Sequence, residues 1–140
     1  MLCTRPPEET SMNPTQLGEL LTAVQLYLDS LYHCDTDMLN EVFHASSSLF
    51  DADEGTLFVE SIESFSADVA SRTSPASTGQ DREDEILGID VLSPVSATVK
   101  VRLRAHQNVF VDHLGVVLTE DGWKIVSKIW HLEKEISNVG

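Results

Sequence analysis

The first half of the chain carries apolar residues at helical spacing. In one stretch they lie three or four positions apart, at Leu17, Leu21, Val24, Leu28 and Leu31. This spacing predicts an amphipathic helix over residues 14–32, which begins after the capping side chain of Asn13. Two shorter helices are predicted after Asp35 and Ser61, because both side chains can cap a first helical turn.

The remaining patterns predict strands. Residues 48–60 carry two brief apolar runs around an acidic turn, which predicts a small hairpin between the second and third helices. After a polar loop at 71–84 the apolar period becomes two, which predicts strands over residues 86–92 and 96–105. Two more strands complete the chain. This order predicts an α+β domain, with three N-terminal helices packed on one face of a curved, mainly antiparallel sheet.

The last two strands can be aligned within the stretch DHLGVVLTEDGWKIVSKIWH, residues 112–131. A two-residue Asp-Gly loop is a favoured hairpin connection, and here it pairs Asp112 with His131. Because a slip of one residue would move every side chain to the other face, the hydrophobic pattern selects this register. Asp112, Ser127 and His131 are therefore expected to project together on the helix-covered side.

Length, composition and charge narrow the class of partners. The 140 residues, 41% of them hydrophobic, predict one domain over residues 13–136 with tails at 1–12 and 137–140. Residues 1–72 hold 13 acidic residues against two basic ones, so neither nucleic acid nor an anionic membrane is an expected partner. The sequence has no apolar run long enough to span a membrane, no signal-peptide pattern and only two cysteines, so a reduced, cytoplasmic protein is expected.

The C-terminal half carries a family resemblance. The stretch from Phe110 to His131, with ILGIDVLSPVSATVKVRL before it, resembles the nuclear transport factor 2-like superfamily, and more narrowly its putative lumazine-binding (SnoaL-like) branch. The resemblance extends from Pro14 to His131. It implies a cone of helices closed by a curved sheet, an apolar pocket inside, and a homodimer formed through the outer face of the sheet. No flavin-type motif accompanies it, so the branch name does not imply lumazine as the ligand.

A pocket between the first helix, the third helix and the sheet is the expected functional site. Its candidate lining residues are Tyr27, Phe65, Val101, Asp112, Leu114, Ser127, Ile129 and His131. One interpretation is a domain that binds a small apolar or aromatic molecule. A second is an isomerase, dehydratase or polyketide-cyclase-like enzyme that needs no cofactor, in which Asp112 sets the tautomer of His131 for acid–base catalysis. A third is an association module whose interior is filled by its own side chains.

The outer face of the sheet is the expected dimer surface. Its candidate residues are His113, Val117, Val126, Lys128 and Trp130. A large aromatic side chain among valines on a solvent-facing sheet indicates a partner surface. No metal ligand set is predicted, because His33, Cys34 and Asp35 are adjacent in sequence and cannot easily converge on one ion.

Overall fold

The structure is a computed structural model that describes residues 11–136. The tails expected at 1–12 and 137–140 lie outside this range, apart from Ser11 and Met12. The helices are α1 (Pro14–His33), α2 (Thr36–Val42) and α3 (Ile62–Ser71), with a short 3-10 helix at Ala76–Thr78. The strands are β1 (Phe43–Asp51), β2 (Phe58–Ser61), β3 (Asp84–Ser93), β4 (Ser96–Ala105), β5 (Asn108–Thr119) and β6 (Gly122–Glu135).

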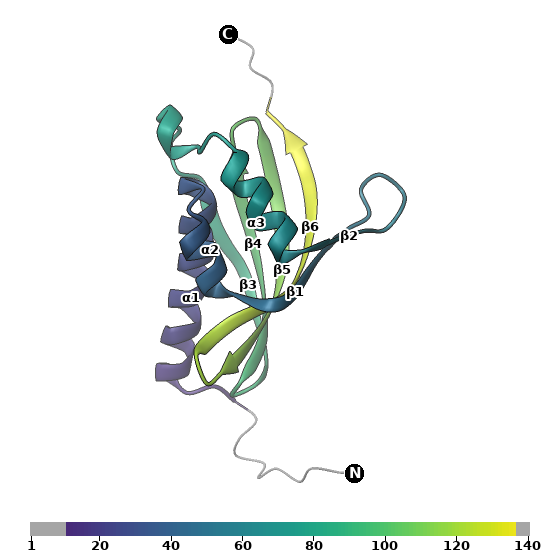
Figure 1. Ribbon diagram of the computed structural model, residues 1–140. Helices are drawn as coiled ribbons and strands as arrows, with labels where there is room; N and C mark the ends of the chain where they lie inside the picture. The colour runs from purple at the N-terminus through teal and green to yellow at the C-terminus, as the bar shows by residue number, and fades with distance from the viewer. Residues whose placement is uncertain (1–10, 137–140) are drawn as a thin grey trace.

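The strands form one mixed sheet with the order β2-β1-β6-β5-β4-β3. All neighbouring strands are antiparallel except β1 and β6, which are parallel. The three helices cover one face of this curved sheet, called the inner face below (Figure 1). The predicted α+β architecture is thereby confirmed.

Local capping explains where the helices begin. The Asn13 side chain accepts a hydrogen bond from Gln16 N at 2.8 Å, and the Gln16 side chain accepts one from Asn13 N at 2.9 Å. This reciprocal pair satisfies two backbone donors that a helix start otherwise leaves free. Asp35 and Ser61 cap α2 and α3 as the sequence predicted, because their side chains accept hydrogen bonds from backbone N–H groups of the first helical turn.

The hydrophobic core lies between the helices and the inner face. Leu20, Val24 and Leu28 from α1 are at most 3% exposed and belong to the same cluster as Val99 and Leu114 of the sheet. Removing this apolar surface from water is the main favourable contribution to folding. The core anchors α1 across the sheet and fixes the side chains that project from it.

The predicted register of the last hairpin is wrong along its whole length. Beside the turn it is wrong by two residues, since Leu118 pairs with Trp123, and the faces are unchanged; beyond Val126 it is wrong by one residue, and the faces are reversed. Asp112 pairs with Trp130, whereas His131 pairs with Val111. The cause is a bulge at Val126, which lies between two paired positions of β6 and has no partner in β5. One extra residue in a strand reverses the faces of all residues beyond it.

The bulge exchanges two sets of side chains between the faces of the sheet. Cross-strand partners share a face, so Lys128 and Trp130 join Asp112 on the inner face. Ser127 and His131 project from the outer face instead. The turn also differs from the predicted one, because Thr119 pairs with Gly122 and leaves Glu120-Asp121 as the loop.

Candidate ligand-binding site

A cavity of about 620 Å³ opens between the inner face and the helices. Four aromatic side chains line it: Phe58, Phe65, Phe110 and Trp130. They come from β2, α3, β5 and β6, so distant parts of the sequence build its wall. The volume and the mainly apolar lining are typical of sites that hold small organic molecules.

Three buried polar side chains lie at the inner end of this cavity, and they are called the polar floor below. They are Tyr27, Asp112 and Lys128, with exposed fractions of 0%, 1% and 5%. The Tyr27 hydroxyl donates a hydrogen bond to Asp112 Oδ2, and Lys128 Nζ lies 3.8 Å from the same oxygen. Asp112 Oδ1 is buried and has no hydrogen-bond partner among residues 11–136.

The surroundings of Lys128 are unusual for a lysine. Its Nζ lies 4.4 Å from the centroid of the Phe65 ring and 5.5 Å from that of Tyr27. Burial lowers the pKa of Lys128, and the nearby carboxylate of Asp112 offsets only part of this effect. The lysine is therefore more readily deprotonated than an exposed lysine.

Tyr27 responds to the same environment in the opposite direction. Burial, and then the negative charge of Asp112, raise its pKa well above the ordinary value of 10.0. The phenol therefore stays protonated and continues to donate to Asp112. It thereby fixes Oδ2 of the carboxylate, whereas Oδ1 has no hydrogen-bond partner among residues 11–136.

Charged side chains stand at the rim of the cavity. Arg72 pairs with Asp68 at 2.6 Å, and its guanidinium lies 5.4 Å from the centroid of the Phe65 ring. Both partners are about half exposed, with side-chain values of 43% and 50%. Solvent screens an exposed pair of this kind, so its contribution to stability is small.

The structure brings some of the predicted pocket residues together and separates others. Tyr27 and Asp112 meet in the polar floor, and Phe65 lines the cavity. Val101 and Leu114 are fully buried in the core and are not among the residues that line the cavity.

The remaining three predicted pocket residues lie on the wrong face. Ile129 is 57% exposed, and Ser127 packs against Gly115 on the outer face. His131 Nδ1 lies 2.7 Å from Asp53 Oδ1, in the β1–β2 connection. The predicted Asp112–His131 contact therefore does not form, because the bulge turns the two side chains to opposite sides of the sheet.

Two residues that the sequence placed at the dimer surface belong to the pocket instead. Lys128 and Trp130 line the cavity, whereas His113 and Val126 lie on the outer face as expected. The sequence feature that could have indicated the bulge is Gly115, since an isolated glycine within a strand often marks a bulge or a close approach. A Cβ at this position would lie 2.5 Å from Ser127 Oγ.

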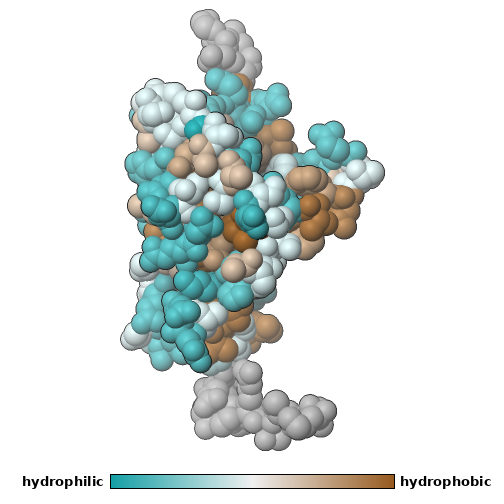
Figure 2. Space-filling model, in the orientation of Figure 1, coloured by the Kyte–Doolittle hydropathy of each residue, from teal (hydrophilic) through white to brown (hydrophobic). Residues whose placement is uncertain are grey.

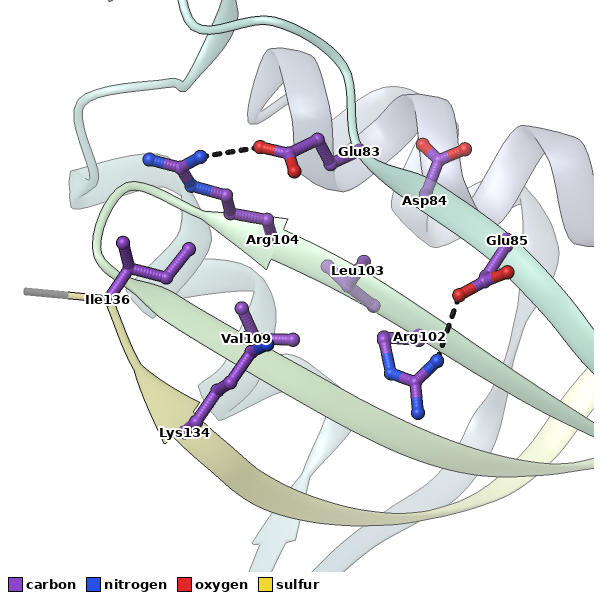
Figure 3. Close-up of a pocket in the computed structure, with 9 residues that line it drawn as sticks. All are labelled: Glu83, Asp84, Glu85, Arg102, Leu103, Arg104, Val109, Lys134 and Ile136. Carbon is purple, nitrogen blue, oxygen red and sulfur yellow. Dashed lines mark hydrogen bonds and ion pairs between the residues drawn. The ribbon is translucent and has the colours of Figure 1, made fainter.

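A second, smaller hollow of about 310 Å³ lies where β3, β4, β5 and β6 run side by side (Figure 3). Arg102 binds Glu85 at 2.8 Å and Glu133 at 3.0 Å, and Arg104 binds Glu83. These contacts neutralise the two arginines within the sheet itself. The two arginines that line the hollow are therefore engaged in exposed ion pairs and are not free to bind an anion.

No helix within residues 11–136 is long and apolar enough to cross a membrane. The same residues contain no group of three or more histidine, cysteine, aspartate or glutamate side chains placed to hold a metal ion.

Three helices over one face of a curved six-stranded sheet, with a pocket between the layers, place the chain in the class of proteins with the nuclear-transport-factor-2-like fold. Within this class the chain belongs to the family described as "Putative lumazine-binding", whose model matches residues 16–131. No curated protein matches the chain significantly.

Solved structures share the fold. A nuclear-transport-factor-2-like protein of unknown function from Silicibacter pomeroyi has a TM-score of 0.72 and 24% identity, over 87% of this chain and 100% of its own. One from Shewanella baltica has a TM-score of 0.78 and 17% identity, over 89% and 100%. A ketosteroid isomerase-like protein from Erwinia carotovora has a TM-score of 0.66 and 12% identity, over 87% and 99%. Identities this low show the fold alone.

Proposed function

We propose that this protein binds a small apolar or aromatic molecule in the cavity above the polar floor. The ligand carries one polar group that accepts a hydrogen bond from Lys128 and donates one to Asp112. The observation that carries this proposal is Asp112 Oδ1, a buried carboxylate oxygen that no group among residues 11–136 satisfies. Buried polar atoms nearly always have a partner, so a vacant one at a cavity indicates a ligand donor.

The walls support an apolar ligand body. Phe65, Phe110 and Trp130 line the cavity, and the rings of Phe110 and Trp130 form an edge-to-face pair with their centroids 5.9 Å apart. Aromatic rings favour flat apolar partners through dispersion and through their quadrupoles. A hydroxyl on a flat hydrocarbon body therefore matches both parts of the site.

The test compares 2-naphthol with 2-methoxynaphthalene by isothermal titration calorimetry. The two probes have the same ring system, but only the naphthol can donate a hydrogen bond to Asp112. We expect the naphthol to bind about tenfold more tightly, which corresponds to about 1.4 kcal/mol. The preference should disappear in Asp112→Leu and persist in Asp53→Asn, whose carboxylate contacts His131 outside the cavity. Equal affinities for both probes in the unaltered protein would contradict the proposal.

A dimer formed through the outer face is part of the same proposal. Ile129, Val126 and Val59 expose 57%, 36% and 53% of their surfaces there. Ile129 lies in register with Phe50 of β1 and His113 of β5, so these side chains form a continuous row across the sheet. Exposed apolar surface of this kind favours association with a second copy. Ile129 and Phe50 replace Lys128 and Trp130 in the predicted dimer surface.

An enzyme that uses acid–base chemistry without a cofactor is the second candidate, and Asp112 and Lys128 favour it. A buried carboxylate next to a readily deprotonated amine can move a proton at the wall of a mainly apolar pocket. His131 has no part in this version, since it lies on the other face. Incubation of 2-tetralone in D2O tests it: Asp112-dependent deuterium exchange beside the carbonyl supports catalysis, and exchange equal to that of Asp112→Leu argues for binding alone.

A further inference from the structure

We propose that Lys128 is a reactive amine that captures aromatic aldehydes or ketones as a covalent imine within the cavity. The inference rests on the proposed function, because the carbonyl compound must first occupy the same pocket. It adds aromatic carbonyl compounds to the ligands of this pocket and assigns Lys128 a covalent role.

The Lys128 amine is buried at the wall of the cavity. The bulge at Val126 turns Lys128 inward, and 95% of its surface is shielded although it contributes to the cavity lining. The near carboxylate oxygen of Asp112 lies 3.8 Å from Nζ, which is beyond direct hydrogen-bonding distance. Among the residues that the structure describes, no acceptor therefore forms a hydrogen bond with this nitrogen at the wall of the cavity.

The other lysines lack this setting. The chain has four lysines, and Lys100 and Lys134 are exposed at the sheet surface. Lys124 donates a hydrogen bond to Glu41 O at 2.6 Å, which fixes its amine in a solvent-accessible position. Burial of a lysine in an apolar or aromatic site is a recognised route to a nucleophilic, imine-forming amine.

The charges around Lys128 have opposing effects. Burial lowers the pKa of Lys128 most strongly, and the positive charge of Arg72 acts in the same direction. Asp112 and Glu60 raise it, but the resulting pKa remains lower than the usual value. A larger fraction of neutral amine is therefore present near pH 7 than for a lysine in water.

Asp112 can serve both proton transfers that the reaction needs. Its Oδ2 lies 3.8 Å from Lys128 Nζ, so the carboxylate can take the proton of the Lys128 ammonium. The nitrogen lone pair then attacks the carbonyl carbon, a C–N bond forms, and the π electrons move to oxygen. A proton passes from nitrogen to that oxygen and gives a neutral carbinolamine.

Loss of water completes the step. Asp112 returns its proton to the carbinolamine hydroxyl, the C–O bond breaks, and a water molecule leaves. The product is a protonated imine, whose positive charge lies beside the restored Asp112 carboxylate. The net change is an ammonium and a carbonyl converted to an iminium and water, so no oxidant or reductant is required.

The experiment uses the full chain with 2-naphthaldehyde and sodium cyanoborohydride at pH 7. The reagent reduces an imine to a stable secondary amine, and peptide mass spectrometry gives the rate of modification at each lysine. We expect Lys128 to react at least about tenfold faster than Lys124, because binding in the cavity holds the carbonyl compound next to Lys128. An excess of 2-naphthol should slow the reaction at Lys128 and leave that at Lys124 unchanged.

Two comparisons make the outcome decisive. The ratio between Lys128 and Lys124 is measured within one folded protein, so it does not depend on the stability of a variant. Rates that are equal at the two lysines, or unaffected by 2-naphthol, overturn the inference. If 2-naphthol still binds by calorimetry in that case, the binding proposal stands and only the covalent role falls; if it does not bind, both fall.

Discussion

At the scale of single residues, Asp112 connects the parts of the site. It accepts from Tyr27 on α1, lies next to Lys128 on β6, and keeps one buried oxygen without a hydrogen-bond partner among residues 11–136. Burying a carboxylate costs free energy unless hydrogen-bond donors or positive charges stabilise it. Here the Tyr27 hydroxyl and the Lys128 amine do so. Tyr27 therefore has two roles, since it packs in the core and orients the carboxylate.

Replacing Tyr27 with phenylalanine has a consequence that depends on pH. The pKa of Tyr27 is raised in the folded protein, so its stabilising contribution is complete below the ordinary value of 10.0 and is lost as the pH rises through the folded value. At pH 8 we expect Tyr27→Phe to lower the free energy of unfolding by about 2 kcal/mol, because a buried hydrogen bond to a charged group is removed.

Urea unfolding of both proteins between pH 8 and high alkaline pH provides the measurement. The stability difference between them should shrink once the pH exceeds 10.0, as the unfolded chain releases the Tyr27 proton and the folded chain retains it. A difference that stays constant or grows across this range would show that the phenol is not held in its neutral form.

At the scale of secondary-structure elements, the bulge in β6 decides which side chains form the site. The helices, their caps and the strand order follow from local patterns, and the sequence predicted them because each depends on residues close in the chain. Three of the eight predicted pocket residues, Tyr27, Phe65 and Asp112, also belong to the observed site. The exchange of Lys128 for His131 was missed, because it depends on an extra residue at Val126 that preserves the alternating pattern on either side.

The close approach of Gly115 and Ser127 beside the bulge gives a prediction for this element. In Gly115→Ala, the new Cβ would lie 2.5 Å from Ser127 Oγ, so the serine must rotate or the strands must separate. We expect a loss of about 1 kcal/mol in the free energy of unfolding, measured by urea denaturation. In the Ser127→Ala background, the same substitution should cost less, since the closest remaining contacts there lie at 3.7 and 3.8 Å. An equal cost in both backgrounds would contradict this packing.

At the scale of the whole molecule, the two faces of the sheet carry different surface features. The inner face carries the cavity, and the outer face carries the apolar row of Phe50 and Ile129. The hairpin of β1 and β2 projects from the body, and Figure 2 shows hydrophobic surface gathered on it. Leu57, at 69% exposed, belongs to this hairpin, while Phe58 extends the wall of the cavity.

This division predicts that association and ligand binding can be changed independently. Ile129→Glu places a charge in the centre of the proposed dimer surface, where burial without a partner is costly. We expect sedimentation equilibrium to give a dimer for the unaltered protein and a monomer for Ile129→Glu, with the affinity for 2-naphthol unchanged. A monomer in both cases would contradict the proposed dimer.

Strand β6 turns Lys128 towards Tyr27 and Phe65 and turns His131 away from them. Nuclear Overhauser contacts in a protein labelled at lysine, histidine and the aromatic rings measure this directly. We expect contacts from the Lys128 ε-methylene to the Phe65 ring, and none from the His131 ring to Tyr27. Contacts between the His131 and Tyr27 rings, with Lys128 free of aromatic neighbours, would contradict it.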